Sequence, residues 1–272
     1  MFPTFSIFGY EIGMYSVCAI IGMVVAVIYE YFALKDRKDI DRVQVVNVAV
    51  VAGLGVFLGA HLLFAVTKWR DLFSAISDYR QTFSSFQNAM KVFLGIFGGM
   101  VFYGGLLGGI VAGVWYIRRL KHIRLDPVVY ADAYAPAIPL FHVFGRIGCF
   151  LGGCCYGMEC RWGFVYHDAP IPESNGVVRL PIQLIESAAN LLLFFILHRM
   201  SKKKPFRGKL ICSYLIMYAP MRFVLEFFRG DVARGFLFQL STSQWISILI
   251  LIAAVISLFV FRKKEREQAD LQ

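Results

Sequence analysis

Long apolar runs alternate with short polar segments along this chain, and the alternation predicts membrane-spanning helices. A helix needs about 17 to 25 predominantly apolar residues to cross a membrane core of about 30 Å. Seven runs approach or reach this length: 12–34, 43–66, 94–117, 127–150, 182–198, 210–228 and 243–261. Pro136, Pro139 and Pro220 interrupt the fourth and sixth runs, which is tolerated where the backbone faces protein or water. The pattern predicts an all-α integral membrane protein of about seven helices.

Two segments between these runs have a different pattern. Residues 69–91 place apolar side chains at alternating steps of four and three, which is typical of an amphipathic helix lying in the membrane interface. The stripe consists of Leu72, Ile76, Tyr79, Phe83, Phe86 and Met90. A helix packed on its neighbours and a mobile gate for a lipid or peptide both fit this stripe. Residues 151–181 hold three prolines, and we expect an irregular cap there.

The basic residues predict the orientation of the chain. Four segments, 35–42, 118–124, 199–209 and 262–266, hold 18 of the 28 Lys and Arg residues. Cytoplasmic loops collect Lys and Arg, so the N-terminus is expected outside and the C-terminus in the cytoplasm. The amphipathic segment and the cap then face outward. The net charge of +10 follows from this topology and from attraction to anionic lipid, so no nucleic-acid partner is expected.

Composition agrees with a membrane location. The 272 residues are 58% hydrophobic, and mean hydropathy is +0.62, more apolar surface than one soluble core hides. No basic residue precedes Lys35, so we expect no cleavable signal peptide. No internal repeat or linker divides the chain. We expect residues 1–272 to form one polytopic domain.

Charged side chains at membrane depth are costly, so each one is a candidate functional residue. The candidates are Arg146, Glu186, Arg222, Glu226 and Arg229. Arg222 and Glu226 share a helix face because they lie four residues apart. They either form a structural ion pair or point into one cavity. Such a pair uses one of three arginines, and two arginines without matching acids indicate an anion, for which a lipid phosphate is the available ligand.

The third run contains a glycine-rich stretch, YGGLLGGIVAG, between Tyr103 and Gly113. Small residues at helical spacing let neighbouring helices approach closely, and helix packing accounts for most of these glycines. Tyr103 fits either an interfacial aromatic belt or a functional site.

Several blocks together resemble the prolipoprotein diacylglyceryl transferase family of seven-span bacterial membrane enzymes. They are the glycine pair Gly104–Gly105 with its preceding residue, GRIGCF at 145–150, LPIQLIES at 180–187, RFVLEFFRGD at 222–231 and LSTSQW at 240–245. The blocks follow the family's order over nearly the whole chain. The combination of GRIG with RFVLEFFR is the more specific part of the resemblance.

The resemblance implies a reaction in the bacterial cytoplasmic membrane. The diacylglyceryl group of phosphatidylglycerol would pass to the lipobox cysteine thiol of a prolipoprotein, releasing glycerol phosphate. Arg146 and Arg222 match family arginines and are expected to hold the phosphate. Glu226 matches a family acid that would orient Arg222 or take the thiol proton. Gln183 and Glu186 match a further block and are expected to shape the substrate pocket. The other residues expected there are Arg229, the glycine pair, Cys149 and Cys154.

The chain departs from the family pattern at several positions. The family usually has histidine before the glycine pair, where this chain has Tyr103, and tyrosine with a pKa near 10 is a poor base. Polar residues of the family's arginine block are replaced by Cys149, Gly152 and Cys154. His142 lies four residues before Arg146 and is a candidate replacement base, although a lone histidine in an apolar helix is more often a packing residue.

Four cysteines lie between residues 149 and 160: Cys149, Cys154, Cys155 and Cys160. Four interpretations stay open: a zinc site, a disulfide in the cap, small packing residues, or a covalent acceptor at Cys154 or Cys155. The spacing C-x4-C-C-x4-C lacks the usual C-x2-C knuckle, so no metal and no cofactor are part of the predicted site.

Two other functions fit the same residues. One is a lipid-modifying transferase of this fold with a different acceptor, and the other is a noncatalytic lipid-binding or thiol-redox membrane protein. A transporter is disfavoured because the chain has no repeated halves.

Overall fold

The computed structural model describes residues 3–7, 10–37, 40–82, 84–119, 126–203, 205, 207–231 and 235–270. The chain forms two compact units. Unit 1 combines Met1–Asp36 with Val128–Gln272, and unit 2 is Arg37–Pro127. Phe83 of the predicted stripe lies outside the described residues, as does most of the basic loop at 118–124. The single domain expected over 1–272 stays a prediction.

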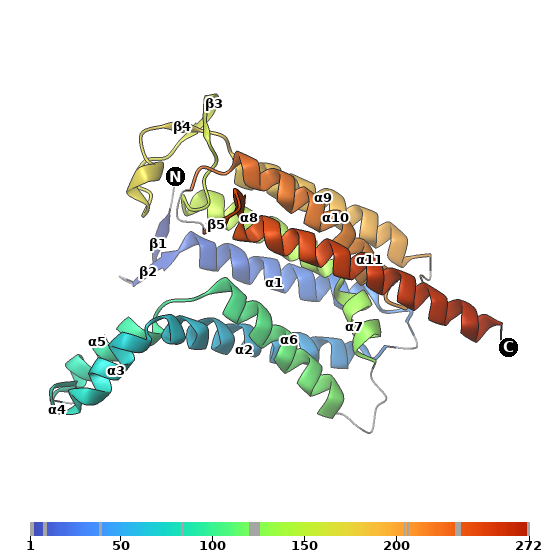
Figure 1. Ribbon diagram of the computed structural model, residues 1–272, viewed down its shortest axis with the longest axis horizontal. Coiled ribbons are helices and arrows are strands. Elements are labelled where there is room, and N and C mark those ends of the chain that lie inside the picture. The colour runs from blue at the N-terminus through green and yellow to red at the C-terminus, as the bar shows by residue number, and fades with distance from the viewer. Residues whose placement is uncertain are drawn as a thin grey trace. The chain divides into compact units, whose positions relative to one another are not determined.

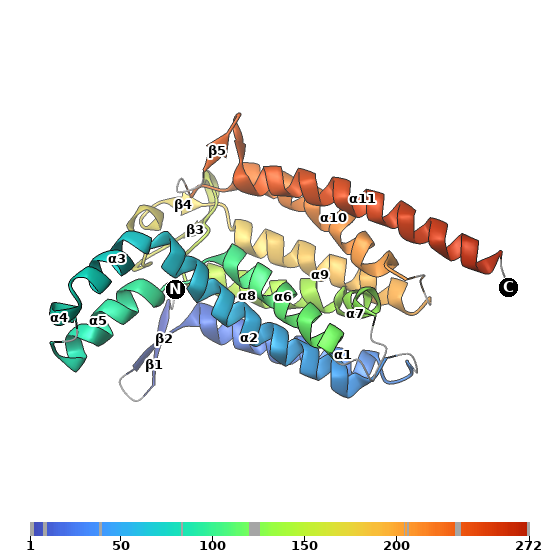
Figure 2. The ribbon, with the colours of Figure 1, turned by 60° about the horizontal axis from the view of Figure 1, so that its bottom comes forward.

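Unit 1 consists of long helices with short strand pairs at one end (Figures 1 and 2). Its helices are α1 (Met14–Ala33), α7 (Pro127–Tyr134), α8 (Ala137–Leu151), α9 (Ile182–Ser201), α10 (Lys209–Leu225) and α11 (Thr242–Ala269), with the 3-10 turns η1 (Pro172–Ser174) and η2 (Glu226–Phe228). The antiparallel pairs are β1 (Thr4–Ile7) with β2 (Tyr10–Gly13), β3 (Glu159–Val165) with β4 (Val178–Arg179), and β5 (Phe236–Leu237) with β6 (Leu240–Ser241). The end of α11 lies at the opposite end of the unit (Figure 1).

Side-chain caps fix where two of these helices begin. Ser241 accepts from the backbone N–H of Gln244 while the Gln244 side chain accepts from the N–H of Ser241, a capping box at the start of α11. The buried carboxylate of Asp132 in α7 accepts from the N–H groups of Gly208 at 2.6 Å and Ile211 at 2.9 Å. A helix N-terminus leaves such donors unpaired, so Asp132 caps α10 from a different helix.

The predicted fourth run is broken where its prolines are. Helices α7 and α8 meet at a bend of 46° just before Ala137, next to Pro136. Proline lacks the N–H that would continue the helical ladder, which explains the break. The predicted sixth run continues through Pro220, and Lys209–Phe228 is long and apolar enough to span a membrane.

Unit 2 is built on a close pair of helices, α2 (Arg42–Thr67) and α6 (Phe102–Arg119). A Cβ atom at Gly104 would collide with the carbonyl oxygen of Gly59, and one at Gly108 would collide with that of Gly55. The two backbones therefore touch along a seam of glycines. Helix packing, the predicted explanation for most of these glycines, is confirmed.

The prediction of one amphipathic helix over 69–91 is wrong. The segment forms α3 (Trp69–Ser77), α4 (Tyr79–Thr82) and α5 (Phe86–Phe97), which extend from one end of the α2–α6 pair (Figure 1). The new start at α5 has a local cause, since the Ser85 side chain accepts from the N–H of Asn88. Helix α5 also takes residues 94–97 of the predicted third run, so the helix that remains, α6, begins at Phe102.

The chain is a multi-pass membrane protein. Among the described residues, five helical segments are long and apolar enough to span: Met14–Ala33, Arg42–Thr67, Ile182–Ser201, Lys209–Phe228 and Thr242–Glu267. The bent α7–α8 pair makes a sixth if its two helices form one span. Their outer faces expose large apolar side chains such as Phe32 and Leu249, each more than 60% exposed. Helix α6, which ends on two arginines, is not among them, and the count of seven stays a prediction. The short strand pairs were not part of the all-α prediction.

Candidate functional site

The candidate site lies in unit 1, where α8, α9 and the end of α10 carry its charged groups. Arg146 on α8 pairs with Glu186 on α9, with 2.9 Å between Nη2 and Oε1. The side chain of Glu186 is 3% exposed and that of Arg146 is 20% exposed. Ser187 donates to the carbonyl of Val143 at 3.0 Å and so fastens the same two helices together. The Arg146–Glu186 pair was not predicted.

A second group of charges surrounds the end of α10. Arg222 and Glu226, for which the sequence left a pair or a shared cavity open, form an ion pair at 2.7 Å. Arg222 also donates to the Ser243 hydroxyl at 3.4 Å. Arg229 lies 3.8 Å from Glu226 and makes a two-pronged contact with Asp231, at 2.6 and 3.0 Å. Glu226 therefore lies between two guanidinium groups.

The expectation that two arginines lack matching acids is wrong. Arg146, Arg222 and Arg229 are each paired with a carboxylate. The acid for Arg146 lies 40 residues away on another helix, so local spacing gave no sign of it. One donor is still available, because Nη1 of Arg222 is buried and has no hydrogen-bond partner among the described residues. A buried guanidinium N–H without an acceptor is costly, and an anion would satisfy it.

His142 and Tyr218 lie near members of both ion pairs. Their ring centroids are 5.5 Å apart, and both side chains are close enough to Arg146 and Arg222 to interact with them electrostatically. Helix α8 is continuous from Ala137 to Leu151, so His142 and Arg146, four residues apart, share a face. The structure thus brings Arg146, Arg222 and the candidate base His142 around one place.

Gln183 supports the segment that follows α8. Its side-chain amide is 1% exposed and donates to the carbonyl of Cys154 at 2.8 Å and to the hydroxyl of Tyr166 at 2.9 Å. Asn190 donates to the carbonyl of Glu186 at 2.8 Å, one helical turn earlier. The donors of Gln183 are thus used within the protein.

The turn after α8 gathers three of the four clustered cysteines. Gly153 and Cys155 both have positive φ, at 69° and 54°, and the N–H of Cys154 donates back to the carbonyl of Cys149 at 3.1 Å. The sulfur atoms of Cys149, Cys154 and Cys155 consequently lie within 4.8 Å of one another. Cys160 is not in this group, and its thiol contacts the carbonyl of Trp162 at 2.5 Å.

The thiol group adjoins the arginines. Hydrogen bonds from the Cys149 and Cys154 thiols lower the pKa of Cys155 below its ordinary value, and the positive charges of Arg229 and Arg146 act in the same direction. Backbone pairing positions Arg229 here, because Gly157 forms a β-bridge with it. All six cysteines are free thiols.

Sequence reasoning missed two residues. Tyr15 on α1 interacts electrostatically with Cys149 and Arg146, and it comes close because Gly148 on α8 has no side chain. Arg179 is 7% exposed and stacks on the Tyr156 ring at 4.3 Å. The sequence spacing of Tyr15 and Arg179 does not indicate that either one belongs to the site.

Arg179 organises the cap segment. It donates to the carbonyls of Glu173 at 2.6 Å and Gly157 at 3.4 Å, and its carbonyl lies against Gly163 where β3 and β4 pair. The cap expected to be irregular therefore contains a strand pair held by one buried arginine.

The predicted residues Tyr103, Gly104 and Gly105 belong to unit 2. Tyr103 is 38% exposed on α6, and the glycine pair faces α2. His61, also in unit 2, contacts the carbonyl of Phe97 at 2.6 Å, so it has a structural partner. His167 is exposed in the cap segment.

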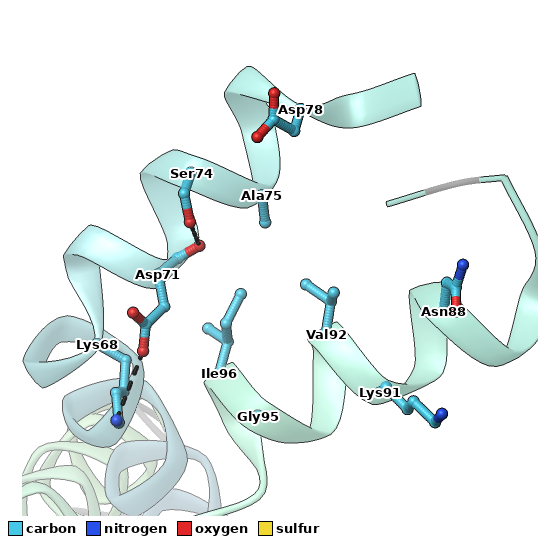
Figure 3. Close-up of a pocket in the computed structure, with 10 residues that line it drawn as sticks. All are labelled: Lys68, Asp71, Ser74, Ala75, Asp78, Asn88, Lys91, Val92, Gly95 and Ile96. Atoms are coloured by element: carbon cyan, nitrogen blue, oxygen red, sulfur yellow. Dashed lines mark hydrogen bonds and ion pairs between the residues drawn. The ribbon is translucent and has the colours of Figure 1, made fainter. Parts of the chain in front are cut away.

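A groove of about 610 Å³ lies between α3 and α5 of unit 2 (Figure 3). Its lining includes a Lys68–Asp71 ion pair at 3.5 Å, together with Asp78 and Lys91. None of the predicted site residues lines it. The groove is formed by α3 and α5 together with the end of α2.

Comparison with known proteins covers nearly the whole chain. The profile of the family described as prolipoprotein diacylglyceryl transferase matches residues 3–260. A phosphatidylglycerol–prolipoprotein diacylglyceryl transferase of Clostridium tetani is 31% identical over 264 residues, covering 94% of this chain and 95% of the relative. Proteins of the same name from Campylobacter lari and Campylobacter hominis are 31% and 34% identical, covering 95% and 91% of this chain and 92% and 86% of their own lengths.

Proposed function

The chain belongs to the prolipoprotein diacylglyceryl transferase family, and from this we propose that it transfers the diacylglyceryl group of phosphatidylglycerol to a cysteine thiol of a prolipoprotein. The product is a thioether-linked lipid, and glycerol phosphate leaves. The observation that carries the proposal is the placement of Arg146 and Arg222 around His142 and Tyr218, with one buried donor of Arg222 unsatisfied.

Arg146 and Arg222 hold the phosphate of phosphatidylglycerol. The thiolate attacks a glycerol carbon, the bond from that carbon to the phosphate oxygen breaks, and the phosphate gains a full negative charge as it leaves. Guanidinium groups bind phosphate through directional, charge-assisted hydrogen bonds. Donors aimed at developing charge stabilise the transition state more than the ground state.

The carboxylates hold these arginines in position. Glu186 fixes Arg146 at 2.9 Å, and Glu226 fixes Arg222 at 2.7 Å. Their side chains are 3% and 2% exposed, so water competes little for either contact. Gln183 shapes the same region because it donates to the carbonyl of Cys154 in the turn. Arg229 contacts Glu226 as a second guanidinium group beside that of Arg222.

The proton of the acceptor thiol needs a destination. The family's usual histidine is replaced by Tyr103, and His142, on the same helix as Arg146, is the histidine placed near the phosphate site. We assign it the role of general base. The lipobox of the prolipoprotein enters from the side of the cap segment, 151–181.

The setting is the bacterial cytoplasmic membrane, crossed seven times. The basic segments predict the N-terminus outside and the C-terminus in the cytoplasm. In unit 1 the first described residues and the end of α11 lie at opposite ends of the helices, which supports this orientation (Figure 1).

The direct test uses purified protein in phosphatidylglycerol micelles, with and without a lipobox peptide, following glycerol phosphate release and peptide mass together. We expect release that depends on the peptide and a diacylglyceryl mass gain on its cysteine. Release with another acceptor present, but not with the peptide, would indicate a different transferase. Lipid binding without release under any condition would overturn the proposed activity.

The Arg146→Lys variant tests the phosphate site. Lysine keeps the charge but loses the fork of N–H donors, so we expect transfer to fall by about 100-fold, the order seen when one oriented donor is removed. The matched control is Arg199→Lys, an exposed arginine in the last turn of α9. Near-normal transfer by Arg146→Lys would contradict the assigned role.

A further inference from the structure

The turn after α8 holds three thiols that neither the phosphate site nor the base uses. Their sulfur atoms lie within 4.8 Å of one another. Cys149 is 7% exposed, and Cys154 and Cys155 are half-buried. Three convergent thiols beside a phosphate-binding arginine suggest a metal site.

The spacing of the sulfurs suits zinc. Zn–S bonds of about 2.3 Å in a tetrahedral site place neighbouring sulfurs about 3.8 Å apart, so closure by about 1 Å or less completes the site. The positive φ of Cys155 and Gly153 curls the turn so that the thiols converge. The spacing of the four cysteines disfavoured zinc because it lacks the usual C-x2-C knuckle, yet the turn brings three of the four sulfurs together.

Three protein ligands define a particular class of zinc site. Structural zinc sites are closed by four protein ligands, whereas catalytic sites have three and keep the fourth position for water or substrate. No fourth His, Cys, Asp or Glu joins this group in the part of the chain that the structure describes. The fourth position is therefore available to a ligand from outside.

We propose that Cys149, Cys154 and Cys155 bind Zn²⁺, and that the metal binds and activates the acceptor thiol. This inference rests on the proposed function and goes beyond it by assigning a metal. A thiol that coordinates zinc is deprotonated, and the thiolate is the nucleophile that the transfer needs. Zinc therefore deprotonates the acceptor thiol, which Tyr103 as a poor base does not do, and the released proton reaches His142 by way of water.

The step balances without a redox partner. The acceptor thiol displaces water from zinc, and its proton passes by way of water to His142, which lies two helical turns before Cys149 on α8. Its sulfur then forms a bond to the glycerol carbon of phosphatidylglycerol, and the bond from that carbon to the phosphate oxygen breaks with both electrons leaving on the phosphate. The thioether product is a weak ligand and is replaced by water.

The position of the three cysteines agrees with thiol activation beside a bound phosphate. Cys149 lies one helical turn after Arg146 on α8, and Arg146 and Arg229 both act electrostatically on Cys155. A thiolate bound to the metal and a phosphate bound to Arg146 are thus neighbours.

Metal binding is tested first and without any activity measurement. Protein purified with a phosphine reductant and treated with dipicolinate is given Zn²⁺ or Co²⁺, and bound metal is counted by mass spectrometry. We expect about one ion per chain, with thiolate-to-Co²⁺ charge-transfer absorption. Cys154→Ala and Cys155→Ala should weaken binding by more than about 100-fold, since even outer-shell changes cost 10- to 100-fold. Cys160→Ala is the matched control and should bind normally.

The activation step is tested with the same samples. Adding the lipobox peptide should change the Co²⁺ visible spectrum, and a peptide with serine in place of its cysteine should not. Dipicolinate should reduce peptide transfer at least about tenfold, with recovery on adding Zn²⁺. Cys154→Ser keeps the shape of the turn, so a loss of metal binding and transfer in this variant is not due to misfolding.

Each remaining outcome overturns part of the inference. Reduced protein that takes up no metal, or a disulfide among the three sulfurs that persists under reductant, overturns the site. Bound zinc with transfer unaffected by dipicolinate overturns activation and leaves the proposed transferase standing. Bound zinc in a protein that transfers nothing under any condition overturns the proposed function itself.

Discussion

The Arg222–Glu226 pair allows a quantitative test of how the site is held together. Glu226 is 4% exposed, lies 2.7 Å from Arg222 and 3.8 Å from Arg229, and is therefore enclosed by positive charge. Glu226→Gln keeps the shape of the side chain and removes the charge. Charges about 4 Å apart interact by about 4 kcal/mol near a protein surface, and breaking a buried pair costs about 3 to 5 kcal/mol. We expect a loss of about 3 kcal/mol in the free energy of unfolding.

The measurement is reversible unfolding in mixed detergent micelles, and the chain offers a matched control. Lys263 and Glu267 have the same four-residue spacing at 3.7 Å, with side chains 80% and 59% exposed. Glu267→Gln should cost less than about 0.5 kcal/mol, because solvent screens exposed pairs. Equal losses for the two glutamine variants would refute the reasoning that burial makes the first pair matter.

A double replacement separates charge pairing from activity. Arg222→Met combined with Glu226→Leu removes both charges, and such replacements are often neutral or stabilising, so we expect stability within about 1 kcal/mol of wild type. Arg229 keeps Asp231 as its partner. The double variant should nonetheless lose transfer activity, because Arg222, the proposed hydrogen-bond donor to the phosphate, is gone. A stable and active double variant would remove Arg222 from the site.

Three further predictions concern the scaffold. Asp132→Ala removes the cap of α10 and should lower the free energy of unfolding by about 1 to 2 kcal/mol, with a smaller effect for Asp132→Asn; mixed-micelle unfolding measures both. Gly108→Ala places a methyl group against the backbone of α2 and should cost about 1 to 3 kcal/mol, whereas Gly95→Ala, with open space around it, should be neutral or slightly stabilising. Arg179→Ala should loosen the cap segment and increase its amide hydrogen exchange, with little change in unit 2.

The helices were largely predictable because lipid imposes a simple rule on sequence. A span must be long and apolar, and the first, second, fifth and last runs agree with the helices to within a few residues, apart from the extra turns that end α11. The hairpin of α3 to α5 was not predictable from periodicity. A stripe at steps of three and four continues across a turn unchanged, because the turn at Ser85 depends on a cap that one serine supplies.

The site was predictable only where its contacts are local. Arg222 and Glu226 follow from helical spacing, and the cysteine turn follows from four cysteines within twelve residues. The Arg146–Glu186 pair joins residues on two helices, so nothing in the local pattern encodes it. Counting arginines within one stretch consequently gave a false excess of positive charge.

The corrected charge balance changes what the arginines do. Three arginines face three carboxylates, so the group does not attract a phosphodiester through net charge. Its advantage is that the guanidinium groups are already oriented before lipid arrives. In the proposed transfer the phosphate gains negative charge as the carbon–oxygen bond breaks, and oriented donors then bind it more tightly than they bound the lipid. Interactions that strengthen only in the transition state raise kcat. Arg146→Lys should therefore lower kcat while KM for phosphatidylglycerol changes little, and a rise in KM at constant kcat would mean that Arg146 only binds the lipid.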